Sequence, residues 1–472
     1  MKLTQKEINY SLRQLALRAG VSRFSSEIDP FQYFPVDIRY QAYKKLSKKP
    51  TKKIIYIRPA GPQDWIDLLN LNSDSISWAP LNTLLPPKIN INISKNIPIL
   101  FPSSTNKRSE EPIKVINKNE IIFNLDIVAA TFFMLSRYEE IINDTRDKYK
   151  RFPANESVAY KQGFLEQPIV DELGLILRSW IQYLLPDWRP EKGTSKVILT
   201  HDIDFIRTLP NMRKMLRTFF VNVKSENLAH SIRNIHNTLL QEKNDLARSP
   251  YLQNIDKIVQ SSLNNGLKSI FFFKASNASF YDSGYDISHT VLKDTFEHIK
   301  DAGFEIGLHP GYYTHKNIKW LKREKDNLEN QINTNVLHCR QHYMRFEPSV
   351  TWKCQQKAGF KFDHTLSYVL HPGFRCGTCR PFKPFDLEEK KEMDITEIPL
   401  IIMDSTLRVY KKYSPSLAKA KIIDLAKKCD AVEGTFTLLW HNTSFSGNWM
   451  EWGHMYTSVL PEISRIFYPQ QK

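Results

Sequence analysis

From Lys196 onward, the chain repeats a pattern in which an amphipathic, helix-like stretch ends at a glycine and a short apolar run follows. The glycines are Gly266, Gly303 and Gly359, and the runs after them are KSIFFF, FEIGL and FKF. Glycine just past a helix adopts the left-handed conformation that ends it, so each unit is predicted to be a helix and then a strand. Helices that alternate with strands predict a parallel sheet or a barrel.

The first 190 residues follow a less regular pattern. Residues 1–20 predict a short amphipathic helix, with an apolar set of Ile8, Leu12, Leu15 and Leu17, and residues 127–138 keep roughly helical spacing. Residues 185–196, LPDWRPEKGTSK, carry two prolines and a glycine directly before an apolar run, as expected of a linker that enters a buried strand. With 472 residues the chain is long enough for two domains. We therefore expect a smaller α+β domain over 1–190 and a second domain over 191–472.

The formal net charge of +16 and the pI near 9.3 raise nucleic acid as a partner. Short basic concentrations lie at 44–53 and 207–217, but much of the charge is dispersed and no nucleic-acid-binding signature is apparent. We therefore expect no nucleic-acid partner. A basic surface, or peripheral membrane contact with an anionic or lipid-linked substrate, explains the charge more simply.

Composition also bears on location. No window offers about 18 apolar residues without charge, and the first twenty residues lack the apolar run of a signal peptide. No transmembrane segment and a cytoplasmic location are therefore expected. Five cysteines, an odd number, favour a reducing compartment, and the lone CxxC at Cys376 and Cys379 lacks the second pair of a zinc ribbon. The sequence indicates no oligomeric state.

Candidate chemistry lies where the predicted strands end, as it does in α/β barrels. The run VILT leads into Asp202 and Asp204, two carboxylates that point the same way on an extended chain and whose repulsion a cation would offset. FEIGL leads into His309, with His315 close behind, and neutral imidazole is a good ligand for zinc, cobalt or nickel. Each signal alone also fits a capping aspartate or a structural histidine.

Two later segments add to this set. The run VLHCRQHYMRF places Arg340 and His342 on one face of a predicted strand and Tyr343 on the other. TFTLLW ends at His441, which suits protonation of a leaving amine because the pKa of histidine lies near neutrality. The recurrence of such residues at equivalent strand ends indicates one shared site.

In order along the chain, these segments resemble the motifs of the polysaccharide deacetylases of carbohydrate esterase family 4, the NodB-homology domain. The matching segments are LTHDID, IFFF, AGFEIGLH, CRQHY and Leu439-Trp440-His441, between about Lys196 and Phe445. The resemblance implies an α/β fold, a distorted (β/α) barrel. It also implies a metal-dependent hydrolase that removes an acyl group from an N-acylated sugar.

The resemblance implies roles for single residues as well. Asp202 becomes the general base, Arg340 the residue that orients this base, and His441 the general acid. Asp204 and His309 become ligands of a divalent metal ion, with zinc expected first and cobalt or nickel as alternatives. Beside them, Tyr343 and Trp440 are expected to contact the substrate.

The chain departs from the family pattern at two places. The family places its second metal histidine four residues after the first, where this chain has Tyr313. His315 and His342 are the alternatives, and we favour His342 because strand positions are held more rigidly than loop positions. Ile203 also separates the two aspartates, which are usually adjacent in the family.

The segment HPGFRCGTCRPF resembles one in Bacteroidetes-type relatives, which carry an uncharacterised N-terminal domain similar to residues 1–190. Arg375 in this segment would meet a substrate carboxylate or phosphate, or else pair with a structural carboxylate. The expected substrate is an N-acetylated precursor of a surface polysaccharide, carried on a nucleotide or a lipid. The alternatives are a related barrel hydrolase for another carbon–nitrogen bond and a noncatalytic carbohydrate-binding protein.

Overall fold

The computed structural model describes residues 1–21, 33–43, 51–71, 76–102, 111–206, 246, 249–276, 279–282 and 285–469. The basic stretch at 207–217 and most of the one at 44–53 lie outside the described residues. None of the helices in these ranges has both the length and the apolar character that crossing a bilayer requires.

The C-terminal region is built on one eight-stranded sheet in which the strand pairings are parallel. Within the described residues no pairing joins its edge strands β14 and β15, so the barrel is open between them. The predicted distorted (β/α) barrel is confirmed. In sheet order the strands are β14 (Thr396–Glu397), β11 (Phe362–Asp363), β10 (His338–Cys339), β9 (Glu305–Leu308), β8 (Lys268–Phe273), β7 (Lys196–Ile203), β16 (Thr435–Leu439) and β15 (Ile402–Met403).

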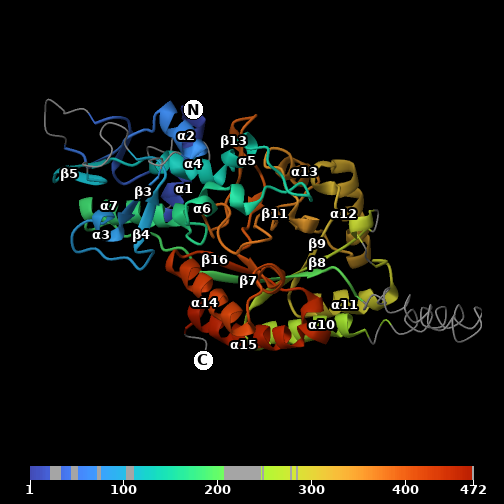
Figure 1. The fold of residues 1–472 in the computed structure, drawn as a ribbon. Helices are drawn as coiled ribbons and strands as arrows, with labels where there is room; N and C mark the ends of the chain where they lie inside the picture. The colour runs from blue at the N-terminus through green and yellow to red at the C-terminus, as the bar shows by residue number, and fades with distance from the viewer. Residues whose placement is uncertain are drawn as a thin grey trace, which may run out of the picture.

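Helices pack on the outside of this sheet, and Figure 1 shows α14 and α15 beside β16 and β7. Gly266, Gly303 and Gly359 have φ values of 63°, 72° and 87°, which confirms their predicted role at helix ends. The helices are α10 (Pro250–Asn264), α11 (Thr290–Asp301), α12 (Ile318–Ile332), α13 (Thr351–Lys357), α14 (Pro415–Ala431) and α15 (Met450–Phe467).

The N-terminal region holds a four-stranded mixed sheet, ordered β1-β2-β6-β5, and lies on one side of the barrel (Figure 1). Its strands are β1 (Asp37–Tyr40), β2 (Ile54–Ile57), β5 (Ile113–Asn117) and β6 (Glu120–Phe123), with a separate pair of β3 (Ser77–Pro80) and β4 (Asn96–Ile99). Its helices are α1 (Gln5–Ala19), α2 (Pro62–Asn70), α3 (Leu81–Leu84), α4 (Ile127–Leu135), α5 (Tyr138–Ile142), α6 (Val158–Lys161) and α7 (Ile169–Leu184).

Two details of this region differ from the sequence prediction. In α1, Leu12 and Leu15 are buried but Leu17 is 51% exposed, because two further residues along a helix lead to the opposite face. The helical spacing over 127–138 belongs to two helices, because Arg137 between them is left-handed with φ 54°.

The two regions meet through buried charges. Glu140 of α5 accepts hydrogen bonds from Nε and Nη2 of Arg375 at 2.9 and 2.6 Å, and from Nε of Arg137 at 2.8 Å. All three side chains are at most 2% exposed. One hydrophobic core also runs through both regions, so the division near residue 190 stays a prediction.

Removing the charge of Glu140 is expected to destabilise the protein strongly. Glu140→Gln leaves the buried Arg375 guanidinium without its carboxylate partner, whereas Arg137 keeps Glu139 at 2.8 Å. Breaking a buried pair in this way costs about 3–5 kcal/mol. Glu156→Gln is the matched control, because Glu156 pairs with Lys161 on the surface and such pairs contribute at most about 1 kcal/mol. Urea unfolding measures both, and equal small losses would contradict the structural role of Glu140.

Candidate active site

A pocket of about 240 Å³ lies at the carboxyl ends of the barrel strands. Strands β7, β8 and β9 each lead directly into a polar side chain that lines it, and β16 is followed two residues later by His441, because parallel strands end on the same rim of a barrel. The predicted site residues that line the pocket are Asp202, Asp204, His309, His342, Tyr343 and His441.

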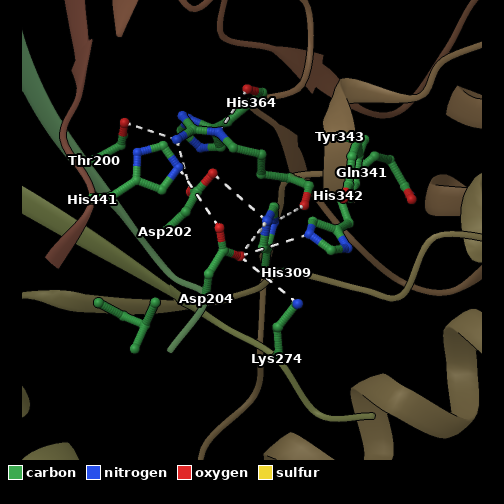
Figure 2. A network of polar contacts seen from close by, with 12 residues as sticks. Thr200, Asp202, Asp204, Lys274, His309, Gln341, His342, Tyr343, His364 and His441 are labelled. Carbon is green, nitrogen blue, oxygen red and sulfur yellow. Dashed lines mark hydrogen bonds and ion pairs between the residues drawn. The ribbon is translucent and has the colours of Figure 1, made fainter. Parts of the chain in front are cut away.

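Asp204, His309 and His342 form a compact group within this pocket (Figure 2). Oδ1 of Asp204 lies 3.4 Å from Nε2 of His309 and 3.8 Å from Nε2 of His342. This oxygen is buried and accepts no hydrogen bond from the described residues. Burial alone raises the pKa of Asp204, but His309, His342 and Lys274 outweigh it and hold that pKa well below its usual range. The group therefore presents an ionised oxygen to two imidazoles.

The outer nitrogens of both imidazoles are already engaged. Nδ1 of His309 lies 2.6 Å from the backbone oxygen of Arg340, and Nδ1 of His342 lies 2.7 Å from Oδ1 of Asp282. An acceptor at Nδ1 places the proton there and leaves the Nε2 lone pair free, which is the usual arrangement of histidines that bind metals. The three side chains thus fit a divalent cation in donor type, orientation and charge.

Asp202 lies beside this group and is held by Arg340. Nη1 of Arg340 donates to Oδ1 of Asp202 at 3.0 Å and to Oγ1 of Thr200 at 2.9 Å, and the guanidinium is fully buried. Oδ2 of Asp202 remains 3.7 Å from Nε2 of His309. The guanidinium therefore fixes one carboxylate oxygen and leaves the other facing the group.

His441 forms a second acid–base pair with Asp404. Oδ1 of Asp404 lies 2.7 Å from Nδ1 of His441, and Oδ2 accepts from the His441 backbone N–H at 2.8 Å and from Ser444 at 2.6 Å. Burial on its own lowers the pKa of His441, but Asp404, followed by Asp204 and Asp202, outweighs burial and raises it to about 10. In the metal-free protein His441 is therefore a charged imidazolium, with Nε2 3.8 Å from Oδ2 of Asp204.

Two of these residues were missed by the sequence analysis. Asp404 directly follows β15, so an acid at the end of an apolar run was the available signal. Asp282 lies in the connection between β8 and α11, and no pattern in its neighbourhood points to His342.

Two residues expected to contact the substrate, Trp440 and Arg375, do not line this pocket. Trp440 is fully buried against Trp452 and Tyr456 of α15, because alternate residues at a strand end face opposite sides and His441 faces the pocket. Arg375 does not line the pocket that contains Asp204, His309 and His342, since its guanidinium is held by Glu140.

The structure brings His342, and not His315, to Asp204 and His309. His315 is 1% exposed, with Nε2 3.8 Å from Glu347. The reason given for favouring His342 was wrong, however. Strand β10 ends at Cys339, and His342 lies in a single 3-10 turn, His342–Met344.

This chain is similar to one described family and to several solved structures. Residues 23–186 match a family described as a family of unknown function (DUF7033). The comparison with curated proteins gives no match.

Among solved structures, a proposed polysaccharide deacetylase of Mycobacterium smegmatis is 16% identical with a TM-score of 0.35, over 59% of this chain and 86% of that one. A CE4 family pseudoenzyme of Bacillus anthracis is 13% identical with a TM-score of 0.28, over 60% and 63%. A family 4 carbohydrate esterase of Streptomyces lividans is 10% identical with a TM-score of 0.27, over 59% and 89%. Likenesses this low assign no activity to this chain.

Replacing His315 and His342 separately tests which of them completes the proposed metal site. His342→Ala is expected to weaken Zn²⁺ binding by more than the roughly 10–100-fold that loss of an outer-shell partner costs, because the group loses one of three donors. His315→Ala is expected to leave Zn²⁺ affinity unchanged. Competition with a chromogenic chelator measures both affinities, and the reverse order would show that His315 is the ligand.

Asp404→Asn is expected to lower the pKa of His441 from about 10 toward its ordinary value of about 6.5. Because the folded-state pKa is raised, the pair stabilises the fold fully below about pH 6.5, and this stability is lost as the pH rises through about 10. The metal-free wild type should therefore lose more stability than Asp404→Asn over that window. Histidine NMR titration, assigned with His441→Gln, measures the pKa, and an unchanged value in Asp404→Asn would contradict the pairing.

Proposed function

We propose that the protein is a metal-dependent hydrolase that removes an acetyl or other acyl group from an N-acylated sugar. One observation carries the proposal. The Asp202–Arg340 and Asp404–His441 pairs flank the Asp204, His309 and His342 group in a single pocket. Hydrolysis of an amide needs a base for water, an acid for the amine and positive charge for the carbonyl oxygen, and this pocket offers a group for each.

The proposed reaction assigns one step to each set of side chains in the pocket. Asp204, His309 and His342 would hold a divalent cation, which supplies positive charge to the acyl carbonyl and acidity to water. Asp202, fixed by Arg340, accepts the proton of the attacking water. His441, kept protonated by Asp404, donates a proton to the departing sugar amine.

The wall of the pocket suits a sugar. The rings of Tyr281 and Tyr343 line it close to the metal group, and aromatic rings offer flat apolar surfaces against which sugar rings pack. The motif resemblance points to an N-acetylated precursor of a surface polysaccharide, and we propose that class, carried on a nucleotide or lipid, as the substrate.

Asp202→Asn is expected to lower the rate of acetate release by about 10²–10⁴-fold, the usual contribution of a general base. The zinc content should remain that of the wild type, because Asp202 is not among the three donors. Asp294→Asn, an exposed position on α11, is the matched control and should retain full activity.

The assay compares free, nucleotide-linked and lipid-linked N-acetylhexosamines with cyclic ureides. Unreduced turnover by Asp202→Asn would refute its role as base. Wild-type cleavage of cyclic ureides in preference to the sugars would replace the proposed substrate by another carbon–nitrogen bond.

A further inference from the structure

The turn that carries His342 has an unfavourable backbone conformation. The next two residues, Tyr343 and Met344, have φ values of 60° and 53°. The left-handed region is costly for residues with a Cβ, and two in succession persist only where surrounding structure holds them. Figure 2 shows Tyr343 directly beside His342, so any relaxation of this turn displaces the imidazole from Asp204.

Contacts from the N-terminal region hold the residues of this turn that follow His342. Nη1 of Arg151 donates to the backbone oxygen of Tyr343 at 3.2 Å, and Nε of Arg345 donates to the backbone oxygen of Tyr149 at 3.1 Å. The ring of Tyr149 also packs on that of Tyr343, with centroids 5.0 Å apart. The loop 147–151, which we call the clasp, therefore contacts the residues that follow His342.

The clasp is itself tightly built. Nε and Nη2 of Arg151 both bind Oδ2 of Asp147, at 2.8 and 2.7 Å, and Oδ1 accepts the backbone N–H groups of Tyr149 and Arg151 at 2.9 Å. The Arg151 guanidinium lies over the Tyr149 ring, 4.8 Å from its centroid. Arg151 is only 8% exposed, so the donor that reaches Tyr343 is placed before any ligand binds.

We propose that the clasp is part of the metal centre and that Arg151 is a positioning residue. Although it lies in the N-terminal region, Arg151 keeps the turn in the conformation that directs His342 toward Asp204. This assigns a role to the segment matched by the family of unknown function, which includes residues 147–151. The inference rests on the metal group of the proposed function and not on its hydrolytic step.

The test is Co²⁺ affinity and the visible spectrum of bound Co²⁺ in Arg151→Ala. Affinity should fall about 10–100-fold, the usual cost of losing a residue that orients a metal ligand, and the d–d bands should change in intensity because their strength depends on coordination geometry. Arg146→Ala is the matched control. Arg146 lies in the same segment and binds the backbone oxygens of Asn143, Thr145 and Glu140, all in the N-terminal region.

A double-mutant cycle separates positioning from general stability. If Arg151 acts through His342, the double variant Arg151→Ala/His342→Ala should bind Co²⁺ as His342→Ala does. Equal Co²⁺ affinity in Arg151→Ala and Arg146→Ala, additive losses in the double variant, or a wild type that binds no Co²⁺ would each overturn the inference. Should Arg151→Ala fail to fold, Asp147→Asn weakens the clasp more mildly and is held to the same criteria. Acetate release does not enter these readouts, so a failed substrate assignment leaves them unaffected.

Discussion

Two carboxylates at the end of β7 are the constraint around which the rest of the site is arranged. Asp202 and Asp204 lie two residues apart on extended chain, so both point into one pocket where water screens their repulsion poorly. Arg340 faces the first at 3.0 Å and Lys274 the second at 3.9 Å, each from the end of a different strand. The barrel makes this balance of charge possible, because it brings side chains that are remote in sequence to one rim.

The parts of the molecule that could be predicted from sequence arise locally. Apolar runs that alternate with glycine-ended helices define the barrel, and polar residues at the strand ends, among them Asp204 and His309, follow from strand geometry. Asp404 also lies directly after a strand. That strand, β15, is only two residues long, however, which is too short to show an alternating pattern of apolar and polar residues. Asp282 could not be predicted, because its partner His342 lies on a separate turn that only the folded chain brings near.

The two residues expected to contact the substrate that lie outside the pocket are packed against other segments of the chain. Arg375 had the chemistry of an anion-binding residue, but Glu140 of the N-terminal region already binds its guanidinium. Trp440 stands beside a pocket residue in sequence and packs under α15 in space. His342 joins the expected group without the rigidity of a strand. Asp282 binds its imidazole, and Arg151 binds the backbone oxygen of the next residue, Tyr343. The N-terminal region is thus tied to the barrel by buried charge, and its Arg151 lines the candidate active site.

The same charges that hold the pocket together also set the pKa of His441, the proposed general acid. Asp404 is the largest influence that raises the pKa of His441, and Asp204 and Asp202 follow. Proton transfer at neutral pH works best when the pKa of the acid lies near neutrality, and a value of about 10 is too high for that. Positive charge placed at Asp204 cancels one of the fields that hold the proton on His441, because Nε2 is only 3.8 Å from Oδ2. The pKa of His441 is therefore coupled to the charge at Asp204, because the Asp204 carboxylate lies next to the imidazole.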